Sequence, residues 1–208
     1  MLKYESSLID WCENNYVINN YICEILNTIT GFIFIIFSLF DMYNIYSVFN
    51  KLNFLTLFIY LLYLTTGIGT VLFHSTLSIF GQYVDEISIL ILIVLLYYDY
   101  KKDMLLAAFG FISLFIPEYN RIFLLISSGI ILFKVKYLNI CNLNEYHKSL
   151  SDKFILQLEI GVCFWLIDLL ACDYLIISLH WIWHIFSCLF LHNLIALLTP
   201  VSVLTTKE

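Results

Sequence analysis

A near-continuous apolar run extends from Leu175 to Leu198 and contains two histidines, His180 and His184. A helix needs about 20 such residues to cross the hydrocarbon core of a bilayer. Residues four positions apart project from one face of a helix, so both imidazoles can reach a single point. Ionisable groups at membrane depth are costly and commonly mark a functional site. The run therefore predicts a membrane helix that carries two ligands of a metal site.

The rest of the chain is also strongly hydrophobic. Of its 208 residues, 62% are hydrophobic and 12% are charged, whereas soluble domains have about 45–50% and 25%. We therefore predict an all-α membrane protein in which residues 1–208 form a single seven-transmembrane helix bundle. Residues 1–20 form an N-terminal segment, and the expected spans lie at about 21–43, 54–74, 83–99, 104–117, 121–138, 153–171 and 175–199.

Lysine and arginine are distributed unevenly between the two sides of this bundle. Lys3 and Arg121 fall on the N-terminal side. The other eight fall on the opposite side: Lys51, Lys101, Lys102, Lys134, Lys136, Lys148, Lys153 and Lys207. The positive-inside rule then places the N-terminus in the lumen or outside the cell and the C-terminus in the cytosol. Residues 1–20 are polar and show no cleavable signal peptide, so we expect the first span to act as the targeting signal.

A third histidine completes the candidate metal site. His74 ends the second apolar run, and Asp85 follows eleven residues later. The seven-span topology brings both residues to the non-cytosolic helix ends, where His180 and His184 also lie. Three histidines with one open position are typical of catalytic zinc. The competing interpretation is packing, because a pair of histidines at this spacing is by itself more often structural than metal-binding.

Acidic residues in the N-terminal segment suggest a second site. Asp10, Glu13 and Glu24, with asparagines between them, supply the hard oxygen ligands that Ca²⁺ prefers. Asp10 and Glu13 alone are equally typical of a solvated acidic segment. Glu24 favours a cation, because we expect it one turn inside the first span, where Asn27 also helps to satisfy it.

The six cysteines show no CxxC spacing, which argues against a thiolate metal site. Cys12 and Cys172 both fall in non-cytosolic loops, where an oxidising compartment permits disulfides. We predict that these two residues are joined. The net charge of −6, without a basic cluster, argues against nucleic-acid binding.

Five stretches, taken in order, resemble the motifs of the alkaline ceramidases: Asp-Trp-Cys-Glu at 10–13, the segment 21–28 around Glu24, Gly67 to Leu77 around His74, Gln82 to Glu86 around Asp85, and His180 to His184. The resemblance implies a seven-helix enzyme that hydrolyses the amide bond of ceramide to a sphingoid base and a fatty acid. It also implies an endoplasmic reticulum or Golgi membrane as the location.

Carried over residue by residue, the resemblance assigns catalytic zinc to His74, His180 and His184, and the acid/base role to Asp85. It assigns calcium to Asp10, the Trp11 carbonyl, Glu13, Asn15 and Glu24. One departure is Thr70, where the family has serine; the hydroxyl is kept for the developing oxyanion, and the added methyl is expected near the metal. A second departure is the short loop expected at Ala171 to Tyr174.

Two other functions fit the same residues. One is a related receptor-like or lipid-remodelling hydrolase with a different lipid substrate, which analysis of lipid products would separate from a ceramidase. The other is a proton-coupled transporter, which is disfavoured because internal repeats and broken helices are not evident. Acyl-chain preference, protein partners and oligomeric state are not specified by these residues.

Overall fold

The computed structural model describes residues 4–49, 54–101, 112, 116, 119–137 and 145–205, and contains no extended strand within them. The helices are α1 (Ile25–Phe49), α2 (Phe54–Thr76), α3 (Ile79–Lys101), α5 (Asn120–Tyr137), α6 (Glu145–Ala171), the short 3₁₀ helix η2 (Cys172–Tyr174) and α7 (His180–Thr205). The all-helical fold expected from the sequence is confirmed. The predicted span at 104–117 lies almost entirely outside the described residues.

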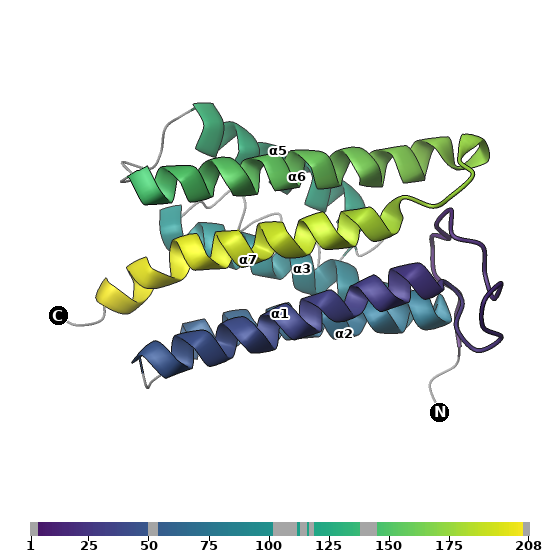
Figure 1. Cartoon of the computed structure of the whole chain (residues 1–208), viewed down its shortest axis with the longest axis horizontal. Coiled ribbons are helices and arrows are strands. Elements are labelled where there is room, and N and C mark those ends of the chain that lie inside the picture. The colour runs from purple at the N-terminus through teal and green to yellow at the C-terminus, as the bar shows by residue number, and fades with distance from the viewer. Residues whose placement is uncertain are drawn as a thin grey trace.

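The long helices run roughly side by side in one bundle (Figure 1). Helix α2 packs between α1 and α3, α6 packs against α7, and α7 also contacts α1 and α3. The N-terminal segment and the C-terminal end of α7 lie at opposite ends of the bundle (Figure 1).

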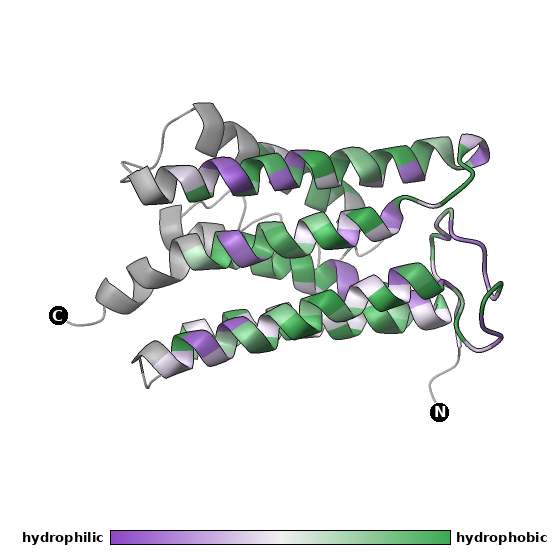
Figure 2. Cartoon of the chain, in the orientation of Figure 1, coloured by the Kyte–Doolittle hydropathy of each residue, from purple (hydrophilic) through white to green (hydrophobic). Residues whose placement is uncertain are grey.

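Hydrophobic residues make up most of the described helices, and polar residues are frequent in the N-terminal segment (Figure 2). Three helical stretches among the described residues are long and apolar enough to cross a membrane: Ile25–Ser47, Phe54–Thr76 and Ser149–Tyr174. Many large apolar side chains on these stretches are exposed, among them Phe32, Ile36 and Leu61. Such a surface is suited to lipid rather than to water.

Several helix boundaries differ from the predicted spans. Glu24 precedes α1 instead of lying one turn inside it, and its carbonyl accepts the first helical hydrogen bond from Thr28 at 2.9 Å. Helix α6 begins at Glu145, before the predicted span at 153–171. The span prediction missed its first turns because they are polar. Helix α7 begins at His180, so the α6–α7 connection covers residues 172–179 and is longer than expected.

Glycines allow the first three helices to approach closely. A Cβ atom on Gly69 of α2 would lie 2.6 Å from the Asp85 nitrogen in α3, and one on Gly67 would lie 2.8 Å from the Ile35 nitrogen in α1. Membrane helices commonly pack through such small residues. These contacts set the distance between α2 and α3 at the level of Asp85.

The N-terminal segment, residues 4–24, crosses the helix ends instead of extending away from them. Ser7 donates a backbone hydrogen bond to the Leu77 carbonyl at 2.8 Å, and Ile79 donates one to the Glu5 carbonyl at 2.9 Å. The Cys23 and Glu24 N–H groups then bond to the Ser75 and His74 carbonyls at the end of α2. The segment therefore caps the end of the bundle where the predicted site residues gather.

Candidate metal centre

The three predicted histidines meet inside the bundle. His74 comes from the last turn of α2, and His180 and His184 come from the first two turns of α7. Their side chains provide ligand atoms that lie within 4.8 Å of one another, and the residues are 0%, 3% and 2% exposed. Among the described residues, this is the one group of three or more histidine, cysteine or acidic side chains close enough to hold a metal ion.

The hydrogen bonds of these rings leave nitrogens available for a metal. His74 Nδ1 lies 2.5 Å from Glu24 Oε2, and His184 Nδ1 lies 2.9 Å from Thr30 Oγ1. His74 Nε2 and His180 Nδ1 are buried and have no hydrogen-bond partner. A buried polar nitrogen without a partner costs about 1–3 kcal/mol. Three converging imidazoles of this kind fit a zinc ion, whose ligands commonly hold the second ring nitrogen in a hydrogen bond.

The start of α7 is held by a carboxylate from another helix. Asp168 of α6 is buried, and its Oδ1 accepts hydrogen bonds from the Leu179 N–H at 2.5 Å and the His180 N–H at 3.2 Å. These donors belong to the first turn of α7, which has no intrahelical acceptors for them. Asp168 Oδ2 also accepts from the Cys12 N–H at 3.2 Å. Asp168 thus places His180 relative to α6 and the N-terminal segment.

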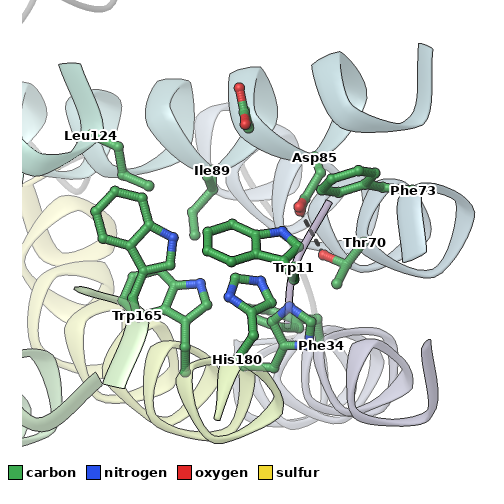
Figure 3. A pocket seen from close by; sticks show the side chains of 12 residues that line it. Trp11, Phe34, Thr70, Phe73, Asp85, Ile89, Leu124, Trp165 and His180 are labelled. Atoms are coloured by element: carbon green, nitrogen blue, oxygen red, sulfur yellow. Dashed lines mark hydrogen bonds between the residues drawn. The ribbon is translucent and has the colours of Figure 1, made fainter. Parts of the chain in front are cut away.

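A cavity of about 40 Å³ is lined by His180 and His184, two of the three histidines. That volume exceeds the roughly 10–15 Å³ that one water needs. Figure 3 shows the Asp85 carboxylate facing the Thr70 hydroxyl on its wall, where Thr70 Oγ1 donates to Asp85 Oδ1 at 2.6 Å. Apolar groups such as Leu124 and Trp165 form the opposite part of the lining. The cavity therefore combines a polar face, suited to proton transfer, with an apolar one.

The methyl group of Thr70 points toward α1. It lies 3.0 Å from the position that a Cβ atom would take on Gly31. Gly31, which has no side chain, leaves space for the methyl group on the side of α1. The Thr70 hydroxyl meanwhile contacts Asp85 and the Thr66 carbonyl of its own helix.

The predicted calcium ligands are neighbours, but they do not form one coordinating group in this structure. Asn15 Nδ2 donates to Asp10 at 2.9 Å, and the buried Asn15 Oδ1 has no partner. Glu13 uses both oxygens at the start of α1, accepting from the Leu26 N–H at 2.6 Å and the Asn27 N–H at 2.9 Å. Asn27 also donates to Glu24 at 2.9 Å, as the sequence suggested.

Burial affects the charge of these acids. It raises the pKa of Asp10 and of Glu13, and it raises the pKa of Glu24 to about 7. Asp10 and Glu24 also share a side-chain hydrogen bond. A cation would favour the charged form of all three, because an opposite charge offsets the loss of hydration.

The sequence predicted the acidic residues as a second site, but in the structure they contact the histidines. Glu24 contacts His74 directly, and its Oε1 accepts the Trp11 N–H at 3.1 Å. The Trp11 ring in turn stacks on His180, with ring centroids 3.6 Å apart. Glu24 and Trp11 therefore belong to both groups, because the N-terminal segment folds over the ends of α2 and α7.

The predicted disulfide is present between Cys12 and Cys172, with Cα atoms 5.3 Å apart. It joins the N-terminal segment to η2, next to Asp168. Cys23 and Cys188 are buried free thiols, and Cys163 is an exposed one. Among the cysteines that the structure describes, none belongs to the histidine cluster.

Two residues of the centre were not identified from the sequence. Asp168 is a carboxylate inside an apolar run, and the reasoning applied to Glu24 could have found it. Thr30 could not be recognised from the sequence, because threonines whose hydroxyl bonds to their own helix are common in apolar helices. Its role depends on α7 lying beside α1.

The fold and the centre define a helical protein with apolar helices of membrane-spanning length and a buried three-histidine cluster that could bind a metal. A sequence model of the family described as "Ceramidase" matches residues 3–208. The chain belongs to the ceramidase family.

Curated relatives match over a shorter part of the chain. An alkaline ceramidase of Drosophila melanogaster is 34% identical over 89 residues, which are 43% of this chain and 31% of the relative. Alkaline ceramidase 1 of Homo sapiens is 30% identical over 90 residues, 43% of this chain and 34% of the relative. An alkaline ceramidase of Saccharomyces cerevisiae, YPC1, is 34% identical over 82 residues, 39% of this chain and 25% of the relative. The matched segments thus span about a third or less of these relatives.

Proposed function

We propose that this chain is a zinc-dependent membrane hydrolase that cleaves the N-acyl amide bond of ceramide-type lipids to a sphingoid base and a free fatty acid. The observation that carries this function is the buried cluster of His74, His180 and His184, with Asp85 and Thr70 on the wall of the adjoining cavity. Membership of the ceramidase family and the names of the relatives support the choice of substrate.

The residues around the cavity suit amide hydrolysis. Zinc held by the three histidines would polarise the amide carbonyl and lower the pKa of water from 15.7 towards about 7. Asp85 takes a proton from the attacking water and returns one to the leaving amine. Thr70 gives up its hydrogen bond to Asp85 and donates instead to the developing oxyanion, a contribution of about 2.7–4 kcal/mol in other enzymes.

Ca²⁺ has a structural or regulatory role in this proposal. Asp10, Glu13, Asn15, Glu24 and the Trp11 carbonyl bind it at the end of the bundle. The hydrogen bond between Asp10 and Glu24 supports this assignment, because two carboxyl groups in contact need either a shared proton or a cation. The unpartnered oxygen of Asn15 lies beside them.

The membrane arrangement follows from the same reasoning. We infer seven spans in a membrane of the endoplasmic reticulum or Golgi, with the N-terminus in the lumen and the C-terminus in the cytosol. The three apolar helices and the opposite placement of the termini support this topology. A lipid substrate can then enter sideways from the bilayer.

The experiment is incubation of the purified full chain with a panel of ceramides, followed by mass spectrometry of the products. We expect equal amounts of free sphingoid base and fatty acid, about one zinc per chain, and loss of both metal and turnover in His184→Ala. Absence of either product with zinc retained would point to a hydrolase for another lipid. Stoichiometric zinc in a variant with all three histidines changed to alanine would contradict the metal site.

A further inference from the structure

Helix α1 contributes no histidine to the cluster, yet it and the residue before it contact two of the three. Glu24, the residue before α1, contacts His74, and Thr30 of α1 contacts His184. His184 is 2% exposed, so protein groups surround most of its ring. Nδ1 of His184 lies 2.9 Å from the Thr30 hydroxyl, and the ring also interacts with the Asn27 backbone carbonyl of α1.

The protons of this contact can be assigned. Thr30 Oγ1 also lies 2.9 Å from the Leu26 carbonyl and 3.1 Å from the Asn27 carbonyl. A carbonyl can only accept, and a hydroxyl has one hydrogen to donate. When that hydrogen goes to the helix backbone, the hydroxyl oxygen accepts from His184, and Nδ1 carries the imidazole hydrogen. Nε2 then keeps its lone pair for a metal.

We propose that Thr30 is a positioning residue that fixes the orientation and tautomer of His184, so that Nε2 of this ring faces the metal. This role rests on the proposed zinc site. It extends the proposed function by assigning to α1 the orientation of a zinc ligand, His184, that belongs to α7. Removing the hydroxyl takes away one of the two α1 groups that hold the His184 ring and leaves the Asn27 carbonyl, while all three histidines remain in place.

Thr30→Val tests this role, since valine has nearly the shape of threonine and no hydroxyl. Loss of an outer hydrogen bond to a metal ligand typically weakens metal binding about 10–100-fold. Thr30→Ser keeps the hydroxyl and is expected to bind zinc like the wild type. Thr65→Val is the matched control, because Thr65 is half-buried like Thr30 and its hydroxyl donates to the Leu61 carbonyl of its own helix, at 2.7 Å.

Zinc affinity is measured by chelator competition on the purified full chain, together with the melting temperature of the metal-free form. We expect Thr30→Val to weaken zinc binding about 10–100-fold with little change in metal-free melting, and Thr65→Val to change neither. Thr30→Ala gives the same comparison if the valine variant does not purify. The cobalt-substituted protein adds a spectrum that reports the ligand geometry directly.

The outcomes separate this role from the proposed function. If Thr30→Val and Thr30→Ala both bind zinc as tightly as the wild type, the role of Thr30 is overturned and the zinc site still stands. Equal weakening by Thr65→Val would also overturn it, because the effect would then be a general one of removing a hydroxyl. Wild-type protein that binds no zinc would refute both.

Discussion

Asp85 and Thr70 form a pair whose hydrogen bond can be preserved while the acid is removed. Thr70 Oγ1 donates to Asp85 Oδ1 at 2.6 Å, and an asparagine at position 85 offers a carbonyl oxygen to the same donor. An amide cannot take up the proton of the attacking water. The substitution Asp85→Asn therefore separates geometry from proton transfer.

We expect Asp85→Asn to keep its zinc and to lower kcat about 10²–10⁴-fold, the usual contribution of general acid–base catalysis. The measurements are metal analysis and the rate of sphingoid base release. Asp152→Asn is the control, because Asp152 is exposed on α6 and is not among the residues that line the cavity. Near-normal turnover in Asp85→Asn would show that another group handles the proton.

At the scale of the helices, the contact between α2 and α3 decides where Asp85 lies. Gly69 faces the backbone of α3 at Asp85, and Gly81 of α3 faces the backbone of α2 at Phe73. Neither contact leaves room for a side chain. Asp85, the proposed proton-transfer residue, is therefore placed by backbone packing as well as by its own hydrogen bond.

Gly69→Ala is expected to push α3 away from α2, because its Cβ atom would lie 2.6 Å from the Asp85 nitrogen. Overpacking of this kind typically costs about 1–3 kcal/mol, so we expect a lower melting temperature and reduced turnover with zinc still bound. Gly129→Ala is a matched control, since a Cβ atom there meets nothing within 4 Å. Alanine at position 129 should be neutral or stabilising, because it favours the helix. An equally stable and active Gly69→Ala would contradict this account of the packing.

At the scale of the whole molecule, the N-terminal segment connects helices that are far apart in the sequence. It bonds to the α2–α3 connection at Leu77, contacts the start of α1 through Glu13, and is tied to η2 by the Cys12–Cys172 disulfide. A cation bound by its acidic residues would hold the same parts together. Stability and activity are then expected to respond jointly to Ca²⁺.

Ca²⁺ is expected to raise the melting temperature of the wild type, since a ligand at 100 times its Kd stabilises the folded state by about 2.7 kcal/mol. Asp10→Asn should reduce this rise and leave zinc content unchanged, because Asp10 contacts Asn15 and Glu24 but none of the three histidines. Glu24→Gln should reduce the rise and also weaken zinc binding, because Glu24 contacts His74. The measurement is thermal unfolding with and without Ca²⁺, paired with metal analysis. Equal shifts in all three proteins would rule out a calcium site at these residues.

Much of the architecture was predictable, because hydrophobic length and helical spacing are local properties. The apolar runs predicted long helices, and the i, i+4 spacing placed His180 and His184 on one face. The cysteine pair was predictable once both residues were assigned to one side of the membrane. The ends of the helices were less predictable from the sequence. Helix α7, for example, starts where Asp168 of α6 accepts hydrogen bonds from the N–H groups at its beginning.

Residue type and spacing were thus sufficient to indicate a helical membrane protein with a histidine cluster, because each helix satisfies its own backbone and its apolar face is visible in the chain. The tertiary structure decided how the parts of the centre touch. Thr30 meets His184 and Glu24 meets His74 only because α1 packs beside α7 and α2, and the acidic segment joins the histidines only because it folds across the helix ends. Such contacts depend on distances between helices, which are set by the packing of Gly67, Gly69 and their neighbours and not by any local pattern.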